Sequence, residues 1–227
     1  MVSEATRMKK ILMTAVVAGM MTGAAGAQSL SGVELGLTGG YAGGLSGSVF
    51  VHSPNLLGPV GVKVSASYTK PSDSINDDNK DALGNTFGSY KAAGAATESG
   101  SQTTVGVDGT YSLGELAPGT DATLYAGGRY GMFRATEDYG GTGSTTYSAS
   151  SFGIGAGVMA SYAIAGNLSI VGDLGVEQYF KSTINASSSN GTSDSFTTDD
   201  AGYANIDNRF VRPGTVFKAR IGIKVSY

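Results

Sequence analysis

The chain of 227 residues contains no cysteine, no tryptophan and a single histidine. Without thiols it can form neither disulfide bonds nor a thiolate metal site. Charged residues make up only 15% of the chain, yet its mean hydropathy is close to zero. Apolar and polar residues must therefore alternate at short range, which favours strands over helical bundles. The 36 glycines, about twice the usual share, agree with a loop-rich or β-rich protein.

The sequence also lacks any apolar run of the roughly 20 residues that a membrane-spanning helix needs. Its longest such run, at 11–22, follows Lys9 and Lys10 and precedes small residues at 25–27. This pattern predicts an export signal peptide over residues 1–27, which is removed by cleavage. If the remaining domain, 28–227, lies in a membrane, it must do so as a closed barrel.

The balance of charge argues against nucleic-acid partners. Removal of the signal peptide takes away Glu4, Arg7, Lys9 and Lys10 and changes the formal net charge from −3 to −5. From this excess of acidic residues we expect no nucleic-acid partner. No residue pattern calls for a cofactor, so we expect none.

Eight segments of the mature chain alternate between large apolar and polar or small residues. Successive side chains of a strand point to opposite faces, so each segment has one apolar face. Turn residues separate the segments, which predicts an all-β, antiparallel, eight-stranded up-and-down barrel. The segments are 33–41, 45–52, 60–68, 104–113, 124–133, 152–162, 168–181 and 217–227.

The charged residues of these segments share the face opposite the large apolar side chains. A soluble sandwich would show the same segregation, so the pattern alone does not establish a membrane protein. We expect these residues to point inward and to form a charge network in the lumen, with Lys181 as a further inward cation. They are Glu34, Lys63, Asp108, Arg129, Asp173, Glu177, Lys218, Arg220 and Lys224.

The connections and the tyrosines favour a membrane barrel. Short turns alternate with long polar connections, expected at about 69–102, 135–146 and 182–209, as in bacterial outer-membrane barrels. Gly/Ser/Thr-rich tracts at 94–103 and 187–198 are expected to be flexible loop tips. Tyrosines near the strand ends suit the aromatic girdles at the two membrane interfaces; they are Tyr41, Tyr68, Tyr111, Tyr130, Tyr147, Tyr162 and Tyr227.

The whole mature chain therefore resembles, in pattern, the small eight-stranded outer-membrane β-barrels of the OmpA and OmpX type. The last strand carries Arg220-x-Gly222-x-x-Val225-x-Tyr227, which resembles the β-signal that the barrel-assembly machinery recognises. Because the eight segments occupy the mature chain, we expect it to differ from OmpA in having no periplasmic peptidoglycan-binding domain. The resemblance implies a bacterial outer-membrane location. It also implies contacts with outer-membrane lipid, lipopolysaccharide or an equivalent, the assembly machinery and other envelope proteins.

We expect a structural or surface-interaction role exerted through the outer loops. Neighbouring strands bring facing side chains within about 5 Å, so Lys218, Arg220 and Lys224 can pair with Asp173, Glu177 and Glu34 and close the lumen. The alternatives are a narrow porin-like channel or small-molecule conduit, and a soluble lipocalin-like carrier with the same strand count.

Catalysis and metal binding receive little support. The only histidine, His52, lies at a turn end without a nucleophile beside it, and the inward acids are interleaved with cations, so we expect no enzyme. In the acidic stretch 73–84, Asp77, Asn79 and Asp81 have the spacing of the first half of a calcium loop. The glycine and the glutamate that such a loop requires are missing, which favours a solvated acidic loop.

Overall fold

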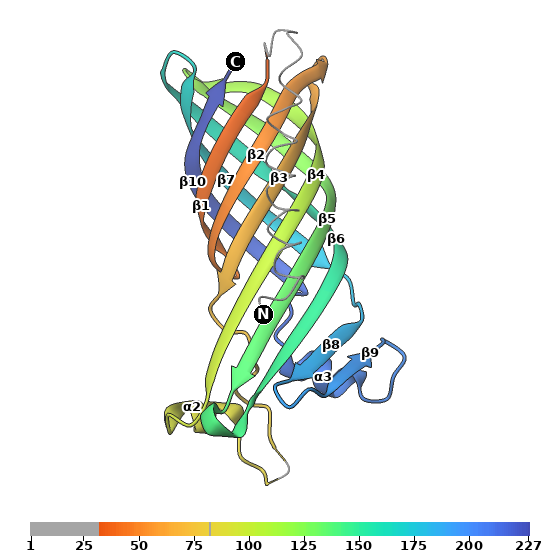
Figure 1. Cartoon of the computed structure of the whole chain (residues 1–227). Coiled ribbons are helices and arrows are strands. Elements are labelled where there is room, and N and C mark those ends of the chain that lie inside the picture. Colours follow the sequence, from red (N-terminus) through yellow and green to blue (C-terminus); the bar gives the residue numbers. More distant parts are fainter. Residues whose placement is uncertain (1–31, 82) are drawn as a thin grey trace.

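The computed structural model describes residues 32–81 and 83–227, so the predicted signal peptide lies outside the described residues. Eight strands form a closed ring in the order β1–β2–β3–β4–β5–β6–β7–β10, with every pair antiparallel and β10 paired back to β1. This is the predicted eight-stranded barrel (Figure 1). Its strands are β1 Glu34–Ala42, β2 Gly44–Leu57, β3 Val60–Pro71, β4 Thr97–Ala117, β5 Thr120–Asp138, β6 Ser144–Ala165, β7 Leu168–Tyr179 and β10 Thr215–Ser226.

Side chains alternate along every strand as the sequence predicts. Large apolar residues point away from the ring and are exposed on its outside, for example Leu37, Leu174 and Ile221. The inward face carries charged residues, serine, threonine and glycine, and these side chains are mostly buried. The interior is therefore polar, and the outer surface of the ring is an apolar band.

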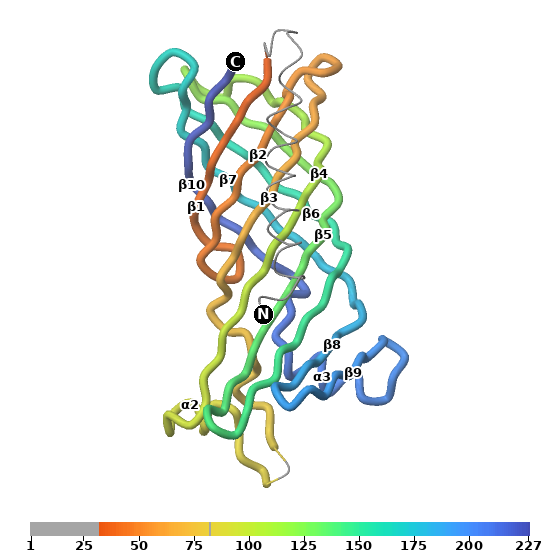
Figure 2. Tube along the Cα trace, in the orientation of Figure 1, coloured from red at the N-terminus to blue at the C-terminus, as the bar shows by residue number. Residues whose placement is uncertain are grey.

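Three short turns lie at the end of the barrel where the chain terminates, as the trace in Figure 2 shows. They contain Gly58, Gly119 and Gly166, whose φ angles are 63°, 74° and 52°. Residues other than glycine rarely adopt this left-handed backbone conformation, so glycine suits these tight turns. We call this the short-turn end.

The opposite end carries a folded extension. Strands β4, β5 and β6, with 21, 19 and 22 residues, are about twice as long as β1, with nine, and continue past the rest of the ring. The hairpin β8 Ile184–Ser188 and β9 Ser193–Phe196 extends their sheet beside β6. The helices α2 Phe87–Ala92 and α3 Tyr203–Arg209 and the short helix η2 Gly140–Thr142 lie at this end too (Figure 1).

This extension, which we call the cap, packs around a hydrophobic core that continues into the adjoining barrel strands. The cap comprises residues 72–101 except Ala82, 134–151 and 180–214. Ile75 and Phe210 form a β-bridge between its first and last segments, and both side chains are buried. The helices of the cap do not cross a membrane: among the described residues, none of the helices has both the length and the apolar composition that a membrane span requires. The cap contributes Ile75, Phe87, Ala96, Ala135, Tyr147, Ala149, Ile184, Tyr203 and Phe210 to this core, and the barrel strands contribute Ala42, Phe133, Tyr179 and Val216.

The cap corrects several expectations about the loops. The connection expected at 135–146 shrinks to 139–143, because β5 and β6 continue as a backbone-paired ladder. Most of the tract at 94–103 belongs to β4, and the tract at 187–198 contains β9, so these are paired strands rather than flexible tips. These strands are rich in serine, threonine and glycine, so they show no hydrophobic alternation from which they could be predicted. Their backbones can still pair, because pairing needs no apolar side chain. Tyr147, expected in the girdle, is instead 4% exposed within the cap core.

Candidate functional site: a charged interior beneath a folded cap

All nine residues expected in the lumen lie on the inward face of the ring. Eight of them are buried, with exposed fractions of 8% or less, and Lys224 is half-buried near the short-turn end. The tenth expected cation, Lys181, was placed wrongly: it lies just past the end of β7, is exposed, and pairs with Asp207 of the cap at 3.4 Å. The alternation that predicted its direction ends where β7 ends.

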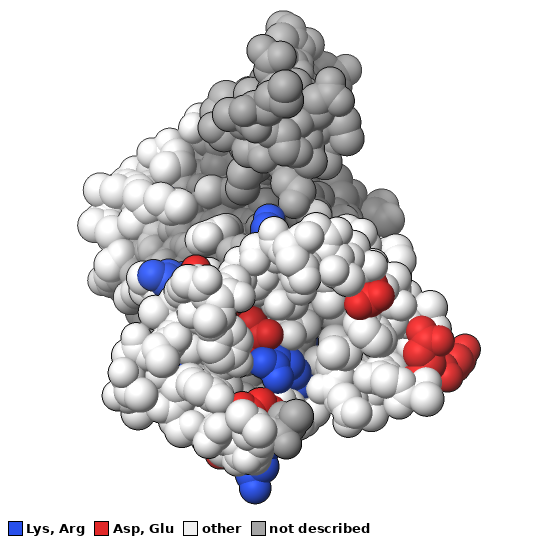
Figure 3. Space-filling view, turned by 60° about the horizontal axis from the view of Figure 1, so that its bottom comes forward, with Lys and Arg blue, Asp and Glu red and all other residues white. Residues whose placement is uncertain are grey.

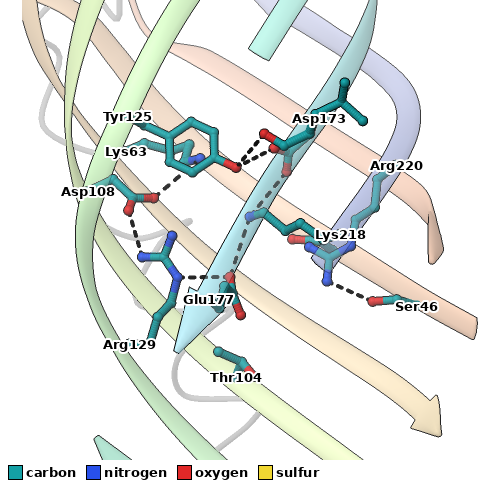
Figure 4. Close-up of polar contacts among 12 residues, drawn as sticks. Ser46, Lys63, Thr104, Asp108, Tyr125, Arg129, Asp173, Glu177, Lys218 and Arg220 are labelled. Atoms are coloured by element: carbon teal, nitrogen blue, oxygen red, sulfur yellow. Dashed lines mark hydrogen bonds and ion pairs between the residues drawn. The ribbon is translucent and has the colours of Figure 1, made fainter. Parts of the chain in front are cut away.

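A buried ion-pair chain crosses the middle of the lumen (Figure 4). Asp108 of β4 accepts a hydrogen bond from Arg129 Nη1 at 2.6 Å and pairs with Lys63 Nζ of β3 at 3.3 Å. Arg129 Nε of β5 donates to Glu177 Oε1 of β7 at 2.9 Å. Breaking one member of such a buried chain leaves an uncompensated charge, which is costly.

The closing strand β10 contributes two of the three expected ion-pairing cations. Lys218 Nζ lies 3.4 Å from both Asp173 Oδ2 and Glu177 Oε1, and Lys224 Nζ lies 2.5 Å from Glu34 Oε1. Arg220 differs from expectation. Although it is opposite Asp173 in the β10–β7 register, its Nη2 donates to Ser46 Oγ at 2.7 Å. Asp173 is already occupied by Lys218 and by the hydroxyl of a tyrosine.

That tyrosine, Tyr125, is the central aromatic side chain of the network. Its hydroxyl donates to Asp173 Oδ1 at 2.6 Å, and Lys63 Nζ lies 3.3 Å from the centroid of its ring. Lys218 Nζ lies 4.9 Å from the same centroid, so the ring contacts two cations. Tyr125 is four residues from Arg129 in the segment 124–133, so alternation puts both on the inward face. Alternation does not predict its role, because cation–π contacts have no spacing signature.

Inward glycines make room for these large side chains. A Cβ atom on Gly155 would lie 2.8 Å from Arg129 Nη2, and one on Gly157 would lie 2.2 Å from the Tyr125 hydroxyl. Both glycines belong to β6, which lies between the strands of Arg129 and Glu177. The Gly-x-Gly-x-Gly pattern at 153–157 therefore serves packing across the lumen.

His52 belongs to the same interior. Its Nδ1 lies 2.7 Å from Glu34 Oε2 and its Nε2 lies 3.0 Å from Thr110 Oγ1, and the ring is 1% exposed. Glu34 thereby joins His52 to Lys224 near the short-turn end. Both ring nitrogens are engaged in contacts that stabilise the barrel wall.

At the other end, Arg209 of α3 holds three segments of the cap together. Its Nε and Nη2 donate to Glu137 Oε2 at 2.9 and 2.6 Å, and its Nη1 donates to Asn79 Oδ1 at 2.9 Å. Burial disfavours the charged guanidinium, but the ion pair with Glu137 outweighs this and raises the pKa of Arg209. Glu137 also accepts a hydrogen bond from Tyr147 Oη at 2.9 Å.

Replacing Arg209 with alanine is expected to loosen the cap without opening the barrel. Hydrogen bonds to charged groups contribute about 1.5–3 kcal/mol each, so the joined segments lose local stability of that order. Amide hydrogen exchange should accelerate in 74–79 and 203–211 and stay unchanged in β1 and β10. Arg134→Ala, on an exposed arginine of the same cap, is the matched control. Equal exchange in both variants would contradict this role for Arg209.

The candidate calcium ligands do not converge. Asp77 Oδ1 pairs with Lys91 Nζ at 2.9 Å, Asn79 Oδ1 accepts from Arg209, and Asp81 accepts from Tyr90 Oη at 2.6 Å. The Tyr90 hydrogen bond holds the pKa of Asp81 below its ordinary value. The spacing in sequence is therefore not a ligand shell in space, because each oxygen already has a separate donor.

A second acidic group lies nearby. Carboxylate oxygens of Asp73, Asp77 and Glu98 lie within 4.8 Å of one another, and Lys91 Nζ reaches Glu98 Oε1 at 2.5 Å as well as Asp77. The hydrogen bond to Glu98 raises the pKa of Lys91, which therefore stays charged and offsets part of the negative charge of the group. The cap thus supplies this cluster with its own cation.

No protein-family model and no curated protein sequence matches the chain. Among solved structures, a major outer membrane protein from Thermus thermophilus is similar to it, with 28% sequence identity and a TM-score of 0.79. That match covers 86% of this chain and 98% of the Thermus chain. The chain is a small outer-membrane β-barrel protein.

Two more solved barrels match more weakly. Neisserial surface protein A has 13% identity and a TM-score of 0.43, covering 86% of this chain and 94% of its own. The attachment invasion locus protein Ail of Yersinia pestis has 11% identity and a TM-score of 0.41, covering 85% and 95%.

The outer-membrane location explains the apolar band of the barrel. Its exposed leucine, isoleucine, valine and phenylalanine side chains face lipid, and Tyr41, Tyr68, Tyr111 and Tyr162 are exposed on the same surface. A soluble lipocalin-like carrier is thereby excluded. Viewed from the cap end, the protein presents a mostly uncharged surface with a few scattered acidic and basic residues (Figure 3).

Proposed function

We propose that this outer-membrane barrel is a closed, non-catalytic structural protein that presents its cap as an interaction surface. The observation that carries the proposal is the filling of the lumen. Asp108, Arg129 and Glu177 form a buried ion-pair chain across it, and Tyr125 lies between Lys63 and Lys218. An eight-stranded barrel is just wide enough for its interior to be filled in this way.

The cap supports the second half of the proposal. A cap that shares a hydrophobic core with the barrel and is held by the ion pair of Arg209 with Glu137 presents a fixed surface, whereas disordered loops would lose conformational entropy on binding. We propose that its partners are other components of the envelope, such as lipopolysaccharide or an equivalent and neighbouring proteins. We further propose that Arg220, Gly222, Val225 and Tyr227 on the last strand are recognised by the barrel-assembly machinery.

Solute flux tests the closed lumen. Purified protein in liposomes should release small sugars and ions no faster than protein-free liposomes. A variant in which 72–96 is replaced by a short turn should behave in the same way, because the ion pairs within the ring close the lumen without the cap. Flux through the wild type would favour the narrow-conduit alternative, and flux through the variant alone would assign closure to the cap.

The absence of native cysteine offers a direct test of the interaction surface. A single cysteine at Leu83, which is 85% exposed in the cap, can carry a photoreactive crosslinker on living cells. We expect it to form adducts with another envelope component. The matched control is Leu116, 64% exposed at the short-turn end. Adducts from neither position, or equally from both, would contradict an interaction role for the cap.

A further inference from the structure

The inward charges of the barrel do not balance. Among the described barrel residues, five cations face four carboxylates when histidine is counted as neutral, which leaves one positive charge in excess. Each of the other four cations forms an ion pair with an inward carboxylate. Arg220 forms none with any described residue, so the excess charge is located at its guanidinium.

The surroundings of Arg220 leave part of its guanidinium without a protein acceptor. The side chain is 7% exposed, and its Nη2 donates to Ser46 Oγ at 2.7 Å. Its Nε is buried and has no hydrogen-bond partner among the described residues. Asp173, the nearest carboxylate in the register, is occupied by Tyr125 and Lys218 (Figure 4). A buried charge in this state is unfavourable unless something else compensates it.

The wall beside Arg220 is lined with hydroxyl groups. Thr38, Ser46, Ser48 and Thr69 are all buried on β1, β2 and β3, and Gly40 is the register partner of Arg220 on β1. Thr69 Oγ1 donates to Ser46 Oγ at 2.8 Å, which orients the hydroxyl that faces Arg220. Ser46 Oγ donates to the carbonyl oxygen of Tyr68 at 3.5 Å and Ser48 Oγ donates to that of Ala66 at 3.1 Å, so these hydroxyls are already engaged. The guanidinium of Arg220, away from an available carboxylate, is the group on this wall that is left to bind an anion.

We propose that the unpaired guanidinium of Arg220 binds one small monovalent inorganic anion of the halide class. One such ion neutralises the excess charge of the lumen and supplies an acceptor for Arg220 Nε. A small ion fits this interior better than a larger polyatomic one, because the lumen of an eight-stranded barrel is nearly filled by side chains. The site does not depend on whether the lumen conducts.

Diffraction from wild-type crystals grown in bromide tests the site directly. The expected result is an anomalous peak in contact with the Arg220 guanidinium. Its absence, a peak only elsewhere, or a guanidinium turned to pair with Asp173 would overturn the proposal. This measurement needs no variant, so it remains decisive even if a substitution at Arg220 impairs insertion.

The dependence of the thermal unfolding temperature on the anion, measured in detergent, is the second test of the site. At equal ionic strength, chloride should raise the Tm of the wild type above its value in gluconate, since an anion that binds only the folded state stabilises it. Arg220→Gln should lose this difference. Lys224→Gln should keep it, because Lys224 is already paired with Glu34. An equal chloride response in wild type and Arg220→Gln would contradict an anion site at Arg220.

Discussion

Replacing Glu177 with alanine is expected to destabilise the folded barrel by about 3–5 kcal/mol. Glu177 accepts from Arg129 Nε at 2.9 Å and from Tyr179 Oη at 2.7 Å, and it pairs with Lys218. All of these groups are buried, so removing the carboxylate leaves positive charge without compensation. Denaturant titration followed by the gel mobility of unboiled protein measures the loss.

The size of this effect distinguishes a dry lumen from a wet one. If water filled the lumen, it would screen the orphaned cations and the loss would fall to within about 1 kcal/mol. Asp121→Ala is the matched control, because Asp121 is exposed at the start of β5 and its removal should cost less than about 0.5 kcal/mol. Equal stability of the two variants would contradict a closed lumen.

Replacing Ile221 with arginine is expected to cost about 2–4 kcal/mol of barrel stability in a lipid bilayer. Ile221 is 67% exposed on the apolar band, near the middle of β10. An arginine there places a charge in hydrocarbon at mid-depth. Folding equilibria in liposomes should show the loss directly.

Depth provides the control for this prediction. Leu35 is also on the apolar band, but it pairs with Val225 near the short-turn end. An arginine at Leu35 can reach the membrane interface and should cost only about 0–1 kcal/mol. If Ile221→Arg were the milder of the two, the depth of the band or the assignment of the lipid face would be wrong.

The barrel could be predicted from the sequence because lipid favours apolar side chains and the lumen favours polar ones, and these two faces alternate along each strand. That rule placed Lys63, Asp108 and Arg129 on the inward face without any knowledge of distance. It did not determine which charges meet. Arg129 reaches Glu177 past β6 only because Gly155 has no side chain, and Tyr125 takes Asp173 away from Arg220.

The cap could not be predicted for a different reason. Its strands continue through serine, threonine and glycine, where hydrophobic alternation fades but backbone pairing persists. Its core joins residues distant in sequence, such as Ile75 and Phe210, and an ion pair joins Arg209 to Glu137. Contacts between residues so distant in sequence leave no local sequence pattern. The sequence therefore predicts loops where the structure has the cap.

Single-channel recording in a planar bilayer tests the central claim, that paired side chains close the lumen, most directly. For the wild-type protein we predict no conductance steps or only very small ones. A protein-free control with the same detergent shows whether any steps come from the detergent. Steady open conductance in the wild type, with ion selectivity shifting toward anions in Glu177→Ala, would contradict the closed barrel and support a channel.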